Sequence, residues 1–410
     1  MTVTKSNIVA KTGNEAMAEA MRQINPDVVA AYPITPATEV VQIFASFIAD
    51  GLVDTEFVPV ESEHSAMSAC IGASAAGGRA MTGTSSQGLA LMAEMLYIAA
   101  GLRLPIVMAD VNRTLSGPLN IHCDHSDTMM VKDSGWIQIF SENAQEAYDN
   151  MLQAVRIAET ARLPVIVTTD GFIISHGMER IEILDDDEVK KFVGVYTPKH
   201  YLLDFDNLIT LGALDLPDYY FEHKRQEIEA MINSKSIIAD IGKEFQTKFG
   251  RGYELFETYR LDDAEAAIVA MGSTAGTIKV VVDDLRSKGK KVGLLKPRVY
   301  RPFPKEEIAD ALKDVKIIAV MDRSDSMNAQ EGPVCLEVKA AIYDASTSLS
   351  IDPEHGRRVD KAKFRPILNY IYGLGGREIR LDDIEFIYNE LFDALKGTDK
   401  ERVNYLGVRE

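Results

Sequence analysis

The chain has 410 residues, a formal net charge of -18, and 46% hydrophobic against 26% charged residues. This length and balance are typical of a globular protein of two domains, and the strong negative charge argues against a nucleic-acid partner or an anionic membrane surface. The three cysteines, Cys70, Cys123 and Cys335, are far apart and form no C-x-x-C pair. They therefore exclude a disulfide framework and provide no ligand set for an iron–sulfur cluster or a structural zinc.

The N-terminal segment MTVTKSNIVAKTGNEAMAEAM lacks the apolar core of a secretory signal peptide. No apolar run of about eighteen residues occurs along the chain, so a transmembrane helix is not expected. We expect a cytoplasmic protein that has no membrane partner.

Helical and strand patterns alternate over the first half of the chain. Val40, Val41, Phe44, Phe47 and Ile48 have the three-to-four spacing of a helix, and runs such as PVIVTT are typical of buried strands. Helices are expected over residues 15–24, 36–49, 63–76, 87–101 and 144–161, and strands over residues 28–34, 80–84, 105–111 and 164–169. Alternating strands and helices indicate a parallel sheet covered on both faces, so the predicted fold class is α/β.

The regular pattern fades between residues 183 and 262, where we expect a connecting arm with one amphipathic helix over roughly 221–249. A second α/β unit begins near residue 266. Its expected helices cover 277–288, 305–312 and 334–345, its expected strands include 291–297 and 316–322, and a polar stretch and tail follow. We assign a first domain to residues 1–245, with the arm at its end, and a second domain to residues 262–410.

Polar residues lie at the starts of the expected helices over residues 36–49 and 63–76. In YPITP, the Thr35 hydroxyl can cap the helix and Pro36 suits its first position. In VESEHSAM, either Glu61 or Glu63 can complement the helix dipole. The helix behind them, SACIGASAAGG, has almost no bulky side chains, so another helix, a partner subunit or a flat ligand must approach it closely. Ordinary capping and packing explain these features, although ligands of parallel sheets also bind at the carboxyl ends of strands.

The next two strands end in a similar way. GTSSQG at residues 83–88 contains serines that can cap the following helix. Arg113 comes just after the strand at 105–111, where its guanidinium can hold a carboxylate in a bidentate pair, although an arginine there is more often a surface residue.

A long loop from residue 112 to about 135 contains His122, Cys123, Asp124, His125 and Asp127. Their spacing matches no established ligand signature, so no metal is assigned. Long loops in compact domains usually belong to an active site or an interface. GSTAG at 272–276 lacks the full G-x-G-x-x-G pattern and is interpreted as a tight turn, and GLGGR at 373–377 is assigned no chemistry.

Together these motifs resemble the α subunit of 2-oxoacid:ferredoxin oxidoreductases, and the pyruvate (pyruvate synthase) branch in particular. The resemblance covers nearly the whole chain and rests on YPITP, VESEHSAMSACIGASAAGGRAMTGTSSQGLALM, NRTLSGP, DSGWIQIFSENAQEAYD, DGFIISH, KPRVYRPFP and YLGVRE. It implies a pyrimidine-binding-type domain for thiamine diphosphate, followed by a transketolase C-terminal-like domain.

The resemblance also implies roles for single residues. Glu63, rather than Glu61, matches the carboxylate that contacts the aminopyrimidine ring. A shielded carboxylate at the ring nitrogen favours the imino tautomer, whose exocyclic nitrogen can take the proton from thiazolium C2. Thr35 and Arg113 match the residues that hold the 2-oxoacid, with Arg113 pairing its carboxylate. Ser86 and Gln87 are assigned to cofactor binding.

The same resemblance implies partner subunits. A G-D-G motif and paired asparagines for the magnesium–diphosphate are absent from this sequence. In the family that half of the cofactor site belongs to a β subunit, and iron–sulfur clusters lie in β and in a ferredoxin-like δ subunit, beside a γ subunit. The implied reaction oxidatively and reversibly decarboxylates a 2-oxoacid with coenzyme A, and passes electrons to ferredoxin.

Two alternatives stay open. Relatives in the pyruvate branch commonly have an aromatic residue where this loop has His122, so a branched-chain or aryl 2-oxoacid such as phenylglyoxylate competes with pyruvate. Thr35 favours pyruvate, and it argues against a second substrate carboxylate, which would call for a basic residue. The other alternative is a chain without this redox activity, either a component of a non-redox thiamine-dependent enzyme or a binding or scaffold module with a vestigial thiamine site.

Overall fold

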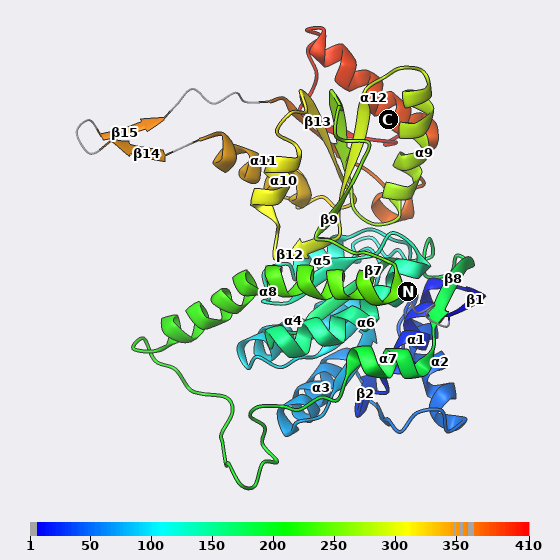
Figure 1. Ribbon diagram of the computed structural model, residues 1–410, viewed down its shortest axis with the longest axis vertical. Helices are drawn as coiled ribbons and strands as arrows, with labels where there is room; N and C mark the ends of the chain where they lie inside the picture. The colour runs from blue at the N-terminus through cyan, green and yellow to red at the C-terminus, as the bar shows by residue number, and fades with distance from the viewer. Residues whose placement is uncertain (1–5, 348, 353–355, 360–364, 410) are drawn as a thin grey trace. The chain divides into compact units, whose positions relative to one another are not determined.

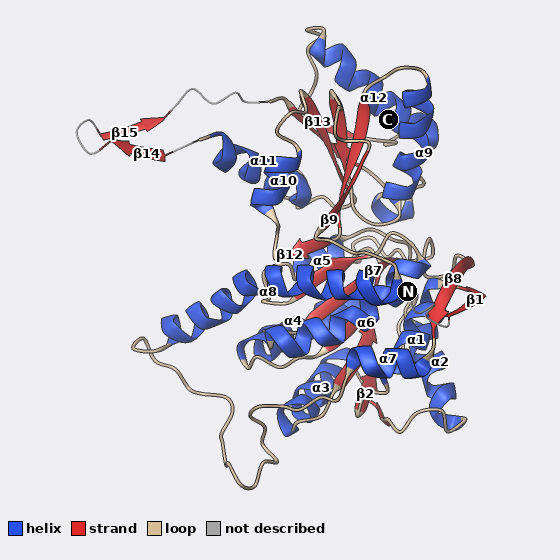
Figure 2. Cartoon of the chain, viewed as in Figure 1, coloured by secondary structure: helices blue, strands red, loops and turns tan. Residues whose placement is uncertain are grey.

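The computed structural model describes residues 6–347, 349–352, 356–359 and 365–409, and it divides into two compact units (Figure 1). The first unit contains Met1–Leu255 together with Val299–Pro302, and the second contains Phe256–Arg298 together with Phe303–Glu410. Each unit has its own central sheet with helices packed against it (Figure 2). The predicted α/β fold class is confirmed.

The first unit is built on a seven-stranded sheet in the order β12-β6-β7-β5-β4-β2-β3. Its strands are β2 (Val28–Ala31), β3 (Glu56–Pro59), β4 (Ala80–Thr84), β5 (Val107–Asn112), β6 (Ile137–Phe140), β7 (Val165–Asp170) and β12 (Val299–Arg301). All neighbours pair in parallel except β12, which is antiparallel to β6. The strands β4, β5 and β7 are buried along their whole length, as in other parallel sheets covered on both faces.

Helices cover both faces of this sheet. They are α1 (Gly13–Ile24), α2 (Thr38–Ala49), α3 (Glu63–Ala76), α4 (Gln87–Gly101), α5 (Ser126–Met130), α6 (Ala144–Ala161), α7 (Asp186–Val193) and α8 (Tyr220–Phe249). The helix pair α3 and α4 packs together, and α1 packs against both α2 and α6. Because βαβ crossovers are right-handed, these two groups lie on opposite faces. Polar caps fix the starts of helices such as α6, where the Asn143 side chain accepts a 2.8 Å hydrogen bond from the Glu146 N–H.

Two local predictions around residue 35 are wrong. The strand ends at Ala31 rather than at residue 34, and α2 begins at Thr38 after Ala37, with no side-chain cap. The peptide bond between Thr35 and Pro36 is cis. The segment is therefore a turn that presents the Thr35 carbonyl group, instead of a threonine-capped helix start.

Several elements were not expected from the sequence. The strands β1 (Ser6–Lys11) and β8 (Glu179–Leu184) form a separate antiparallel pair, and the stretch expected to be a connecting arm also contains α7 and β9 (Phe256–Tyr259). The short strands β3 and β6 were missed because four-residue strands carry little periodicity. The predicted amphipathic helix over 221–249 is confirmed as α8.

The second unit has a six-stranded sheet in the order β17-β16-β13-β10-β11-β9. Its strands are β9, β10 (Ala266–Val269), β11 (Val292–Pro297), β13 (Ile317–Asp322), β16 (Ile367–Ile371) and β17 (Val403–Tyr405). Its helices are α9 (Thr274–Ser287), α10 (Lys305–Ala311), α11 (Pro333–Ser346) and α12 (Leu381–Leu395), with a 3-10 turn at Leu374–Gly376. A two-stranded hairpin, β14 (Leu349–Asp352) and β15 (Gly356–Val359), follows α11. Only β9 pairs antiparallel among the strands of the larger sheet.

The C-terminal third contains more helix and strand than the predicted polar stretch and tail. Helix α12 buries Ile384, Ile387, Tyr388 and Leu391 at helical spacing, and the Tyr388 hydroxyl donates a 2.9 Å hydrogen bond to the Gly293 carbonyl. GSTAG contains a turn at Gly272 and Ser273, and α9 begins within the motif, at Thr274. Among the described residues, none of the helices combines the length and the apolarity that a membrane crossing requires.

Candidate active site

The predicted site residues all lie at the carboxyl edge of the sheet in the first unit. They follow β2 (Thr35), β3 (Glu63), β4 (Ser86 and Gln87) and β5 (Arg113). These strands are neighbours and parallel, so their carboxyl ends meet at one edge.

Arg113 connects three of the strand ends through its guanidinium group. Nη1 donates a 2.7 Å hydrogen bond to the carbonyl oxygen of Thr35, and Nη2 donates a 3.2 Å hydrogen bond to Oε1 of Gln87. Nε lies 3.3 Å from the carbonyl oxygen of Asn120. Among the described residues, these bonds use one hydrogen on each nitrogen, so each terminal nitrogen keeps one N–H. The guanidinium can thus still donate two further hydrogen bonds.

Arg113 keeps its positive charge although it is buried. The residue is 8% exposed, and burial lowers the pKa of its guanidinium from the ordinary value, while the charge of Asp127 raises this pKa. An arginine remains protonated at neutral pH in spite of such a shift. A positive charge with reduced hydration therefore lies at this edge of the sheet.

Ser86 and Gln87 connect to the same network. The Ser86 hydroxyl lies 2.6 Å from both Oε1 of Gln87 and the carbonyl oxygen of Thr114. Ser86 has φ 50° and ψ -119°, a backbone conformation that residues other than glycine rarely adopt. The expected serine cap is absent, because the Ser86 side chain accepts no hydrogen bond from the backbone N–H groups in the first turn of α4.

Glu63 is the first residue of α3 and is only 6% exposed. Ser62 caps the helix by accepting a hydrogen bond from the Ser65 N–H, so Glu63 is not used for capping. Glu61 is exposed and accepts a hydrogen bond from the Ser65 hydroxyl. None of the described residues donates a hydrogen bond to the Glu63 carboxylate.

Gly88 and Thr84 complete the surroundings of this carboxylate. A Cβ atom at Gly88 would lie 2.8 Å from Oε1 of Glu63 and 2.4 Å from Oγ1 of Thr84, so only glycine fits there. Thr84 Oγ1 is itself buried without a protein hydrogen-bond partner in the described part of the chain. Buried polar groups are normally paired, so an unpaired carboxylate and a nearby unpaired hydroxyl indicate a place for a ligand with polar atoms.

A rim of rings lies beside the Thr35 turn. The His122 ring is 5.3 Å from the Phe172 ring, which is 4.8 Å from the His176 ring. Gly171, next to Phe172, is close enough to Pro36 that an added Cβ would lie 3.0 Å from Cγ of Pro36. His122 is exposed, and its loop contacts Arg113 through Asn120.

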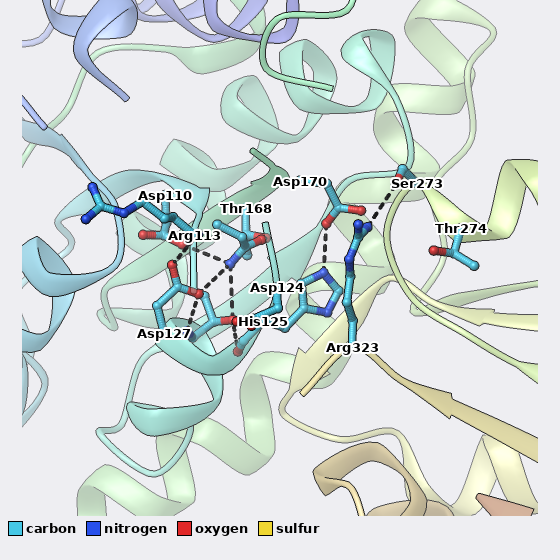
Figure 3. Close-up of polar contacts among 12 residues, drawn as sticks. Asp110, Arg113, Asp124, His125, Asp127, Thr168, Asp170, Ser273, Thr274 and Arg323 are labelled. Carbon is cyan, nitrogen blue, oxygen red and sulfur yellow. Dashed lines mark hydrogen bonds and ion pairs between the residues drawn. The ribbon is translucent and has the colours of Figure 1, made fainter. Parts of the chain in front are cut away.

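The acidic residues of the loop at 112–135 have different hydrogen-bond partners. Asp127 is buried beside Asp110 (Figure 3). Its carboxylate accepts hydrogen bonds from the N–H of Arg113 at 2.9 Å and from Nδ2 of Asn112 at 3.0 Å. Asp124 accepts a hydrogen bond from the Ser126 N–H within the loop.

His125 pairs with the end of β7. Its Nε2 lies 2.7 Å from Oδ1 of the buried Asp170, and Cys123 is close by, with donor atoms of the three within 4.8 Å of one another. These contacts fix the loop to β7, and no role for a metal is assigned to them.

Sequence reasoning missed three contributors to this site. Gly88 and Thr84 were read only as part of a serine-containing helix start, and Asp127 only as one of several acidic loop residues. A glycine in the first turn of a helix was the available signal for a close approach. The role of Asp127 had no local signal, because Ser86, Asn112 and Arg113, which donate to its carboxylate, lie 14 or more residues away in the sequence.

Comparisons with known proteins show the family of this chain. Residues 19–243 match the family described as pyruvate flavodoxin/ferredoxin oxidoreductase, thiamine diphosphate binding, and residues 264–384 match pyruvate:ferredoxin oxidoreductase core domain II. The first of these matches spans more than half of the chain.

The chain belongs to the pyruvate:ferredoxin oxidoreductase family.

Relatives in this family align over almost the full length. The pyruvate synthase subunit PorA of Thermotoga maritima is 55% identical over 98% of this chain and 98% of its own, and PorA of Methanocaldococcus jannaschii is 46% identical over 99% and 100%. The ketoisovalerate oxidoreductase subunit VorA of Pyrococcus abyssi is 43% identical over 95% of each chain.

A solved 2-oxoglutarate:ferredoxin oxidoreductase from Magnetococcus marinus shares the fold. It has a TM-score of 0.66 and 22% identity, and the alignment covers 94% of this chain and 65% of that chain. The pyruvate:ferredoxin oxidoreductase fold of this chain is thus supported by two independent kinds of comparison.

Proposed function

We propose that this chain is the cofactor-activating subunit of a thiamine-diphosphate-dependent 2-oxoacid:ferredoxin oxidoreductase. In this proposal Glu63 acts on the aminopyrimidine ring, and Arg113 binds the 2-oxoacid. The observation that carries the proposal is the buried Glu63 carboxylate, 6% exposed and without a donor among the described residues, beside the space that Gly88 leaves open.

The surroundings of Glu63 suit a carboxylate that bonds to a ring nitrogen. Thiamine diphosphate, when bound, supplies the nucleophile and the electron sink for decarboxylation of a 2-oxoacid. Glu63 shares a proton with the pyrimidine nitrogen in this proposal. A carboxylate exposed to solvent would exchange its proton with water and would not act on the ring. The Thr84 hydroxyl, which is buried without a protein partner, lies at the same end of the site and can bond to a polar atom of the ring.

Arg113 orients the substrate in this proposal. Each terminal nitrogen of its guanidinium keeps one N–H after bonding to Thr35 and Gln87, so a carboxylate can bind in a bidentate geometry. Gln87 and Ser86 keep this guanidinium in place and lie at the start of α4, beside Gly88. Thr35 contributes its carbonyl to Arg113, and its exposed side chain is free to contact the substrate.

Partner subunits complete the site. Helix α4 begins at Gln87 and exposes Leu91, Tyr97 and Ile98 at 50%, 48% and 40%, which is unusual for large apolar side chains on one helix. We assign this face to a β subunit that binds the diphosphate and Mg²⁺. The iron–sulfur clusters are assigned to β and to a ferredoxin-like δ subunit, since this chain has only three cysteines, far apart in sequence. A γ subunit, ferredoxin and coenzyme A are the further partners of the proposed complex.

The test is anaerobic purification of the native complex followed by replacement of Glu63 by Gln. We expect wild-type complex to reduce ferredoxin or a viologen with a 2-oxoacid and coenzyme A, and Glu63→Gln to lose at least about a hundredfold in kcat, because a group that takes part in proton transfer is removed. Glu61→Gln is the matched control and should retain activity, since Glu61 is exposed. Undiminished turnover of Glu63→Gln, or a complex without iron–sulfur absorbance, would contradict the proposal.

The substrate is assigned to pyruvate, with a branched-chain 2-oxoacid as the second candidate. PorA relatives reach 55% identity and the VorA relative 43%, so sequence similarity favours pyruvate. His122 on the rim of the site favours the alternative, because relatives in the pyruvate branch commonly have an aromatic residue at this position. Turnover of pyruvate, 3-methyl-2-oxobutanoate and phenylglyoxylate, measured side by side, distinguishes the candidates.

A further inference from the structure

Asp127 holds two strand ends of the active site at once. Its Oδ2 accepts hydrogen bonds from the N–H groups of Ser86 at 3.1 Å and of Arg113 at 2.9 Å. Its Oδ1 accepts from Nδ2 of Asn112 at 3.0 Å and from the N–H of Thr128 at 2.8 Å. The Asp127 side chain is completely buried, so water cannot replace these bonds.

The two backbone donors belong to different strands. Ser86 follows β4 and Arg113 follows β5, and one carboxylate oxygen bonds to both. The side chains that extend from these strand ends meet where Nη2 of Arg113 bonds to Gln87. That oxygen therefore helps to set the separation of the two main chains, and hence the approach of Arg113 to Gln87, together with the bond from the Ser86 hydroxyl to Thr114.

The backbone of Ser86 needs such a restraint. Its φ of 50° is uncommon for a residue with a side chain, and conformations of this kind persist only where the surroundings enforce them, at a cost of about 1–3 kcal/mol. The bond from its N–H to Asp127 is one of those restraints, and the bond from its hydroxyl to Thr114 is another.

The neighbouring Asp110 shows that Asp127 carries the negative charge of this cluster. Asp110 and Asp127 are both fully buried, and one Nδ2 group, that of Asn112, bonds to both carboxyl groups. Asp127 has four donors, whereas Oδ1 of Asp110 has none in the described part of the chain. Two adjacent buried carboxylates do not ionise together, so the proton resides on Asp110.

We propose that Asp127 is the positioning residue of the substrate site, which fixes Arg113 and the Ser86–Gln87 turn for binding of the 2-oxoacid carboxylate. The inference rests on the proposed function and extends it to a residue that touches neither substrate nor cofactor. Asp127 sets the geometry of the donors, while Arg113 makes the contact.

The test is Asp127→Asn in the assembled complex, with Asp110→Asn as the matched control. Asparagine has the same shape as aspartate, but its NH2 group must face one pair of donors, which lose their acceptor. We expect Asp127→Asn to raise the KM for the 2-oxoacid about tenfold while kcat and the Kd of thiamine diphosphate change less than about threefold, because a misplaced arginine loses a charge-assisted contact. Asp110→Asn should leave the KM near the wild-type value, since it replaces a protonated carboxyl group.

A merely structural role would lower the yield of folded complex without changing the KM of the folded fraction. An unchanged KM in folded Asp127→Asn, or an equal rise in KM in both variants, would overturn the inference. If Asp127→Asn does not fold, Asp127→Glu keeps the charge but displaces it by one methylene, and a wild-type KM in that variant would also overturn it. Activity of wild-type complex together with inactivity of Glu63→Gln keeps the proposed function separate from this outcome.

Discussion

Nη1 of Arg113 donates a 2.7 Å hydrogen bond to the carbonyl oxygen of Thr35, a residue 78 positions earlier in the chain. The bond joins the end of β5 to the turn after β2, across the intervening strand β4. The sequence predicted that both residues bind the substrate. The structure adds that they also bind each other, so a change at Arg113 alters the Thr35 turn as well.

Replacement of Arg113 by Lys should weaken substrate binding more than cofactor binding. Lysine keeps the charge, but it cannot bond to Thr35 and Gln87 and also present two parallel donors. We expect the KM for the 2-oxoacid to rise at least about tenfold, and Arg113→Ala to have a larger effect, with the Kd of thiamine diphosphate within about threefold of wild type. Steady-state kinetics and a cofactor titration measure the two effects, and an equal loss in both would refute the assignment.

Gly88→Ala should inactivate the complex without unfolding the chain. The new Cβ would lie 2.8 Å from Oε1 of Glu63 and 2.4 Å from Oγ1 of Thr84, so the carboxylate must move. We expect a loss of about tenfold or more in kcat, which depends on the Glu63 position. The control is Gly101→Ala at the other end of α4, where a Cβ meets no atom within 4 Å, and where activity should be unchanged. Full activity of Gly88→Ala would show that Glu63 is not held as described.

Asp110→Asn should stabilise the chain, and more so at higher pH. Burial, followed by the charge of Asp127, raises the pKa of Asp110 well above 3.8, so the folded state retains a proton that the unfolded state releases. The stabilising contribution of this group is fully present below about pH 3.8 and is lost as the pH rises. Asparagine does not titrate, so we expect a gain on the order of 1–3 kcal/mol at pH 8 and a smaller gain at pH 5. Urea unfolding of the two chains at both pH values checks this, and a gain that shrinks with rising pH would contradict it.

Arg251→Gln should destabilise the first unit. Arg251 donates to both carboxylate oxygens of the fully buried Asp149, at 2.7 and 2.8 Å, and without it a buried charge stays uncompensated. We expect a loss of about 3 kcal/mol at pH 8. Burial already raises the pKa of Asp149, so protonation should reduce the loss at pH 5.

The control for Arg251 is Arg225→Gln on the exposed side of α8. Arg225 pairs with Glu229, and both side chains are at least half exposed. Such pairs contribute less than about 1 kcal/mol. Similar losses of unfolding free energy in the two variants, measured by urea unfolding, would mean that the buried pair contributes no more to stability than the exposed pair.

The sequence alone determined the fold class and the order of most elements, because helical spacing and buried apolar runs are local properties. The resemblance of its motifs to 2-oxoacid:ferredoxin oxidoreductases also indicated Thr35, Glu63, Ser86, Gln87 and Arg113 as site candidates. The sequence did not predict the short strands β3 and β6 or the start of α2, because the hydrophobic pattern extends over too few residues there. The helix α12 had readable spacing at Ile384, Ile387 and Leu391 but was missed.

Only the tertiary structure decided how the candidates act together. Contacts such as Arg113 with Thr35, Gly88 with Glu63, and Asp127 with Ser86 join residues far apart in sequence or on different elements, and no local pattern encodes them. A parallel sheet places its strand ends side by side irrespective of the chain length between them. The hydrogen bonds among Thr35, Ser86, Gln87 and Arg113 therefore arise from the strand order, which the sequence pattern does not specify.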